Sequence, residues 1–68
     1  MSDIGTFPKR LQNLRERRRI SRRVLSELCG LSKNMIAQYE RGEKEPTAGA
    51  LVEIADFFEV TTDYLLGR

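Results

Sequence analysis

The chain of 68 residues contains no histidine, no tryptophan and a single cysteine, Cys29. One cysteine cannot form a disulfide within the chain, and a zinc site would lack its usual histidine and cysteine ligands. No apolar run approaches the roughly 20 residues of a membrane-spanning helix, and the N-terminus has no apolar signal core. Because a lone thiol is typical of a reducing compartment, we expect a soluble, cytoplasmic protein without a metal or other cofactor.

Features of an enzyme are also scarce. The sequence lacks histidine for acid–base chemistry, a cluster of metal ligands and a glycine-rich phosphate loop after a strand. A chain of this length makes one small domain, which we expect to cover residues 1–68 with residues 1–5 flexible. Such a domain has little room for a substantial pocket, so an enzyme is the least favoured class of protein.

Apolar residues recur at helical spacing, and valine, isoleucine and threonine never form a strand-like alternation. Serine and threonine caps and glycine stops divide this pattern into segments. The expected helices are one over residues 7–18, one between Ser21 and Gly30, one capped by Ser32 and running to about Arg41, one opened by Pro46 and Thr47, and a short one capped by Thr61. The fold class that follows is all-α, a compact bundle of five short helices.

Charge is distributed unevenly along the chain. Residues 9–44 contain eleven lysines and arginines against four acidic residues, whereas residues 45–67 contain five acidic residues and no base. The densest stretch, "RERRRISRR" at residues 15–23, holds six arginines. It is either an unstructured basic arm or the place where two helices meet a polyanion. A basic part of this kind favours a polyanionic partner over an ordinary mixed, solvated surface.

Cations stand at the starts of two expected helices. Arg22 and Arg23 begin the second helix and Lys33 begins the third, although a cation near a helix N-terminus costs about 0.3–1 kcal/mol at an exposed site. A bound phosphate would turn that cost into a gain, because backbone N–H groups and side chains would converge on it. Exposed cations that simply tolerate the penalty are the alternative. Two consecutive helices with this arrangement favour phosphate binding.

The stretch "SRRVLSELCGLSKNMIAQYERG" has the form of a helix-turn-helix unit, in which one helix ends at a glycine and a second follows after a three-residue turn. Ser26 is small where the second helix would cross close to the first. Gly30 is free to adopt a positive φ in the turn. Leu31 would insert the turn into the core, and Ile36 would anchor the second helix there. The helix-turn-helix is therefore expected from the second and third helices.

These residues resemble the lambda-repressor-like helix-turn-helix domains of phage repressors, Cro proteins and many bacterial regulators. The resemblance covers residues 7–67, through "LRERR", "LSELCGLS", "MIAQYERGEKEP" and "LVEIADFFEVTTDYLLG". Three positions depart from the family pattern. Arg19 stands where glycine is usual, Cys29 where an aliphatic residue is usual, and Arg22 where glutamine is frequent. The last departure implies a stronger but less selective phosphate contact.

The resemblance implies that the third helix lies in the major groove of double-stranded DNA. At about 100° per residue, its outward face would present residues suited to base edges. Lysine suits guanine, asparagine and glutamine suit adenine, and alanine leaves room for a thymine methyl group. The expected base-reading residues are Lys33, Asn34, Ala37 and Gln38, and the expected phosphate-contacting residues are Arg22, Arg23, Ser32, Arg41 and Lys44.

Two further roles follow from the resemblance. Arg15 matches the family arginine that pairs with the glutamate at position 40, so Arg15 and Glu40 would form a structural ion pair between the first and third helices. The C-terminal segment serves as a dimer contact in the family, which suggests Phe57, Thr62 and Leu66 as contact residues.

The function that these features imply is sequence-specific binding of double-stranded DNA by a transcriptional regulator, most simply a repressor that binds a palindromic operator as a homodimer. An antitoxin or adaptor whose main partner is a protein, with DNA binding used for autoregulation, is the alternative. An arginine-rich RNA binder is disfavoured, because no aromatic residue that could stack on bases lies near residues 15–23.

Overall fold

The computed structural model describes residues 6–67, which form five helices and no strand. The helices are α1 (Phe7–Arg18), α2 (Arg22–Leu28), α3 (Met35–Glu40), α4 (Ala48–Phe58) and α5 (Thr62–Leu66). The predicted all-α fold is therefore confirmed, and the expected flexibility of residues 1–5 lies outside the described residues. Within residues 6–67, no helix has both the length and the apolar character needed to cross a membrane.

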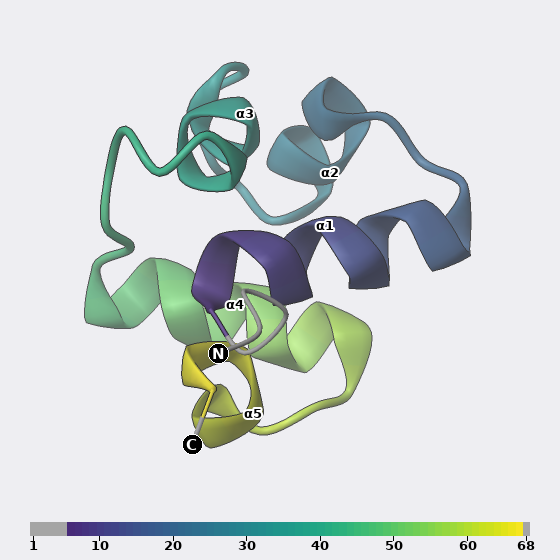
Figure 1. Ribbon diagram of the computed structural model, residues 1–68. Coiled ribbons are helices and arrows are strands. Elements are labelled where there is room, and N and C mark those ends of the chain that lie inside the picture. The colour runs from purple at the N-terminus through teal and green to yellow at the C-terminus, as the bar shows by residue number, and fades with distance from the viewer. Residues whose placement is uncertain (1–5, 68) are drawn as a thin grey trace.

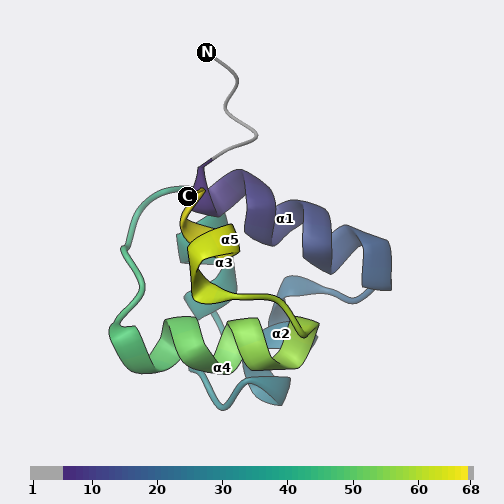
Figure 2. The same cartoon turned by 90° about the horizontal axis from the view of Figure 1, so that it is seen from below.

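The helices are arranged on two sides of α1. In Figure 1, α2 and α3 lie on one side of α1, and α4 and α5 lie on the other. Figure 2, seen from the α4 and α5 side, shows α5 in front of α3. The helix-turn-helix pair and the C-terminal helices thus pack on a shared core beside α1.

Each helix contributes one fully buried aliphatic side chain to that core. These residues are Leu11, Leu25, Ile36, Ile54 and Leu65, all with no exposed surface. Full burial of a side chain of this size contributes about 1.5–3 kcal/mol. No helix can leave the bundle without exposing one of these five side chains, which is why such short helices hold a defined arrangement.

The third helix begins later than the sequence predicts. Its N-cap is Asn34 and not Ser32, and residues 33–34 form a turn closed by a 2.9 Å hydrogen bond from the Met35 N–H to the Ser32 carbonyl. The physical reason lies in α2, where the buried Ser26 Oγ accepts a hydrogen bond of 3.1 Å from the Ile36 N–H. The Ile36 N–H at the start of α3 therefore has its hydrogen-bond acceptor in α2. A serine N-cap next to α3 in the sequence is not required.

Two helices end on residues with left-handed backbone that are not glycine. Arg19 follows α1 with φ +56°, and Glu59 follows α4 with φ +58°. The left-handed conformation costs a residue with a Cβ roughly 1–2 kcal/mol. Arg19 thus adopts a left-handed backbone that glycine adopts without strain, so α1 ends on a strained residue.

Candidate nucleic-acid interface

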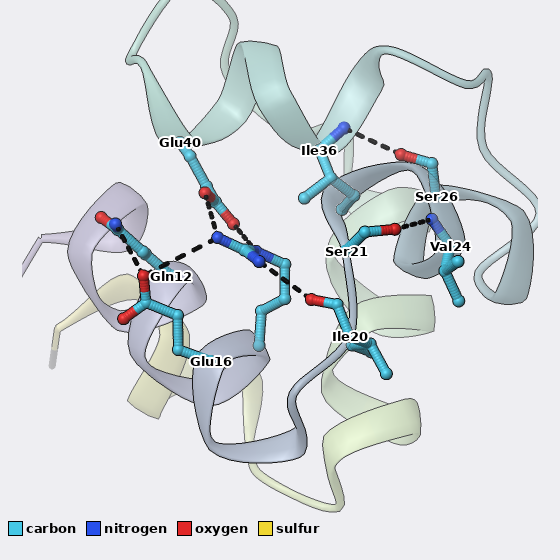
Figure 3. A network of polar contacts seen from close by, with 9 residues as sticks. Gln12, Glu16, Ile20, Ser21, Val24, Ser26, Ile36 and Glu40 are labelled. Carbon is cyan, nitrogen blue, oxygen red and sulfur yellow. Dashed lines mark hydrogen bonds and ion pairs between the residues drawn. The ribbon is translucent and has the colours of Figure 1, made fainter.

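The turn between α2 and α3 is fixed by backbone hydrogen bonds and by its contacts with the core. Gly30 has φ +71° and donates its N–H to the Glu27 carbonyl at 3.1 Å, while the Leu31 N–H reaches the Ser26 carbonyl at 2.8 Å. Leu31 packs against the core, as predicted. The Ser26 to Ile36 hydrogen bond, drawn in Figure 3, closes the unit. The start of α3 is therefore held in one orientation relative to α2.

The end of α3 is held by an ion pair. Arg15 Nε lies 2.6 Å from Glu40 Oε2, and a second hydrogen bond of 3.2 Å joins the same side chains. Another guanidinium nitrogen of Arg15 donates to the Ile20 carbonyl at 2.9 Å, and Figure 3 labels both acceptor residues, Glu40 and Ile20. The two side chains are only 13% and 4% exposed. Removing one partner of such a buried pair costs about 3–5 kcal/mol, so this contact fixes α3 against α1.

The expected base-reading residues lie along α3 and the turn before it. Asn34 is exposed at the N-cap, and Ala37 and Gln38 are half-buried in the helix. Their spacing of three and four residues places them on one side of α3. Lys33 is also exposed, but it lies in the turn that precedes the helix. Including Lys33 in a regular helical face was therefore wrong, because α3 starts only at Met35.

The expected phosphate-contacting residues are all exposed and lie near helix ends. Arg22 and Arg23 occupy the first turn of α2, directly after the N-cap Ser21, whose Oγ accepts from the Val24 N–H at 3.0 Å. Ser32 precedes the turn that leads into α3. Arg41 is the C-cap of α3, and Lys44 lies in the loop that follows. The Arg23 guanidinium also lies 3.6 Å from the exposed Glu27 carboxylate.

One acidic residue near this surface was not found from the sequence. Glu43 lies two residues after Arg41, and its Oε2 accepts a 2.8 Å hydrogen bond from Arg41 Nε. This hydrogen bond lowers the pKa of the Glu43 carboxyl and raises that of the Arg41 guanidinium. The signal in the sequence is an acid directly after the glycine that ends α3, but its side-chain direction depends on the backbone of that turn.

The charges separate by helix. The expected phosphate-contacting cations belong to α2, α3 and the segments beside them, where Glu27 and Glu43 are also exposed, whereas α4 and α5 lie on the opposite side of α1 in Figure 1. The acidic residues Asp56, Glu59 and Asp63 are exposed on or directly after these two C-terminal helices. A polyanion that approaches α2 and α3 therefore meets more positive than negative side chains.

The three expected dimer-contact residues lie in the C-terminal helices. Phe57 is half-buried and packs edge-on against Phe58, with their ring centres 5.0 Å apart. Thr62 begins α5 and is half-buried, and Leu66 ends α5 with 41% of its surface exposed. Leu66 is therefore the member of this set that offers the most apolar surface, while Phe57 is shared with the core.

Five helices in this order, with α2 and α3 joined by a glycine turn and presenting polar and basic side chains, define a helix-turn-helix protein. A model of the Helix-turn-helix family matches residues 11–65. The chain belongs to this family.

Known proteins similar to this chain are transcriptional regulators. The HTH-type transcriptional regulator AnsR of Bacillus subtilis (strain 168) is 41% identical over 59 residues, which are 87% of this chain and 51% of AnsR. The Cryptic phage CTXphi transcriptional repressor RstR of Vibrio cholerae is 37% identical over 60 residues, covering 88% of this chain and 54% of RstR. The chain thus spans about half the length of these relatives.

A solved structure with the same fold is that of the P22 c2 repressor protein in complex with the synthetic operator 9T. It has a TM-score of 0.86 and 30% sequence identity, and it covers 93% of this chain and 97% of that one. The two chains therefore share their fold over nearly their whole described length.

Proposed function

We propose that residues 1–68 form a single domain that binds double-stranded DNA sequence-specifically as a transcriptional regulator, most simply a repressor. The observation that carries this proposal is α3. The exposed Asn34 at its N-cap and the half-buried Gln38 follow the basic start of α2, and both ends of α3 are fixed by contacts to other helices. The named relatives are regulators, and the P22 c2 repressor has been solved on an operator. No observation favours an antitoxin, an adaptor or an enzyme.

In this proposal α3 lies in the major groove and reads base edges. Gln38 is central to the reading face, because it lies within the helix and one turn after Asn34. Side chains at both ends of the helix pair bind phosphates, which sets the register of the protein without reading sequence. The base-reading set is Lys33, Asn34, Ala37 and Gln38, and the phosphate-binding set is Arg22, Arg23, Ser32, Arg41 and Lys44.

Two copies of the chain would bind a palindromic operator from one face of the duplex, with half-sites about 34 Å apart. The exposed Leu66, together with Phe57 and Thr62, supplies the contact between copies. A regulator of this kind would act in the cytoplasm, and the proposed reading of bases needs no cofactor.

Selection of binding sites from random duplex DNA at near-physiological salt tests this function. We expect a palindromic consensus, and affinity that falls steeply with salt because bound phosphates release counterions. On the selected site, Gln38→Ala should cost about 1–3 kcal/mol and relax the base preference at one position. Lys44→Ala is the matched control, since loss of a phosphate contact weakens binding to all sequences alike. Affinity that does not change with salt would refute DNA binding, and equal losses for Gln38→Ala on all sequences would refute base reading.

A further inference from the structure

Arg41 at the end of α3 already holds an anion within the protein. Its Nε and a terminal guanidinium nitrogen donate to the two carboxylate oxygens of Glu43, at 2.8 and 3.2 Å. Arginine binds phosphate groups with the same bidentate geometry. The carboxylate of Glu43 therefore occupies one of the guanidinium edges that a DNA phosphate could use.

The backbone places Glu43 there. Gly42 has φ +74° and donates its N–H to the Tyr39 carbonyl at 3.1 Å, and the Glu43 N–H then reaches the Gln38 carbonyl at 2.9 Å. This pair of hydrogen bonds is the Schellman ending of a helix. Nothing lies within 4 Å of a Cβ built on Gly42, so glycine is needed there for its backbone conformation and not for space. The turn that ends α3 therefore fixes where the Glu43 side chain starts.

Other cations of the interface are held less closely. The Arg23 guanidinium lies 3.6 Å from Glu27, beyond hydrogen-bond distance, and both side chains are more than 60% exposed. Arg41 and Glu43 are each 52% exposed, so their pair can open to a phosphate that reaches it. Among the expected phosphate-contacting residues, all within the described part of the chain, Arg41 is the one with a two-point carboxylate partner.

We propose that Glu43 is a positioning residue that competes with DNA phosphates for Arg41 and thereby lowers the affinity of the protein for non-cognate duplex DNA. The inference rests on the proposed function. On random DNA, Arg41 exchanges one anion for another and gains little. On a cognate site, base contacts of α3 hold the neighbouring phosphate close to Arg41, which gives that phosphate a high effective concentration. The cognate complex must still break the Arg41–Glu43 pair, so Glu43 lowers the affinity for both kinds of duplex.

A double-mutant cycle on a random-sequence duplex tests this competition. The proteins are the unaltered chain, Glu43→Gln, Arg41→Gln and the double variant, each titrated over a range of salt. One phosphate contact adds about 0.9 to the salt slope, which corresponds to about eightfold in affinity at about 0.1 M salt. We expect Glu43→Gln to gain about this much in slope and affinity. Arg41→Gln alone should not raise affinity, since it removes a cation and leaves the Glu43 carboxylate without its partner. In the double variant the gain seen with Glu43→Gln should disappear.

Glu45→Gln is the matched control, since it removes the same charge from another exposed side chain of the same loop. We expect it to raise affinity less than Glu43→Gln and to leave the salt slope unchanged. An equal gain in both variants, or a gain that persists in the absence of Arg41, would show a simple effect of net charge and overturn the inference alone. Absence of any duplex binding by the unaltered chain at low salt would overturn the proposed function as well.

Discussion

The substitution Ser26→Ala removes a buried hydroxyl group and should lower the free energy of unfolding strongly. Ser26 is fully buried, and its Oγ accepts the 3.1 Å hydrogen bond from the Ile36 N–H. Alanine fits the same space without the acceptor, so the Ile36 N–H is left buried and unpaired. An unsatisfied buried donor costs about 1–3 kcal/mol.

This cost is large for a domain of this size. At about 0.05–0.15 kcal/mol per residue, a chain of this length has a free energy of unfolding of about 3–10 kcal/mol. In domains of comparable length, each 1 kcal/mol lowers Tm by about 4–8 °C. We therefore expect Ser26→Ala to lower Tm by at least about 4 °C and to shift the urea midpoint downward without a change in the m-value.

Urea and thermal unfolding followed by far-ultraviolet circular dichroism measure this effect. Ser32→Ala is the control, because it removes the same hydroxyl from an exposed residue outside any helix. A surface change of this kind usually alters stability by less than about 0.5 kcal/mol. If Ser26→Ala destabilised the protein no more than Ser32→Ala, the assignment of the Ser26 hydroxyl as the cap of α3 would be refuted.

Two further predictions concern strain and alkaline pH. Glu59→Gly should stabilise the fold by about 0.5–1 kcal/mol, because glycine relieves the left-handed strain at φ +58° in excess of its own entropic cost. A lower Tm for this variant would contradict that reasoning. Burial, and secondarily Glu53, raises the pKa of the Cys29 thiol. The unfolded chain then loses this proton first, so stability should fall as pH rises above about 8.5. Cys29→Ala should show a shallower fall in its urea midpoint across this range, and an identical fall in both proteins would exclude a contribution from the thiol.

The helices that the sequence predicted well are those whose ends are set by neighbours in the chain. Thr47 and Thr61 cap α4 and α5 through hydrogen bonds to N–H groups three residues later, at 3.1 and 3.0 Å. Gly42 ends α3 because its φ of +74° suits glycine. Such signals depend only on local chemistry, so a sequence displays them directly.

The start of α3 was predicted wrongly because its determinant is not local. Ser32 is a good N-cap by type, but the acceptor that serves the helix start is Ser26, ten residues before Ile36. The sequence required a small residue at position 26 for space and did not reveal this hydrogen bond. Lys33 was assigned to the helix for the same reason, and Glu43 was missed because its contact with Arg41 depends on the turn at Gly42.

The shortness of α3 has a consequence for how the protein loses its function. A helix of six residues, Met35–Glu40, is far below the length at which an isolated helix is stable in water. It persists because Ser26 holds its first turn and Arg15 holds its last residue, Glu40. The reading surface therefore cannot melt on its own while the bundle remains, and it cannot survive once the bundle opens. Heat, urea or a destabilising substitution should remove DNA recognition and tertiary structure in one cooperative transition.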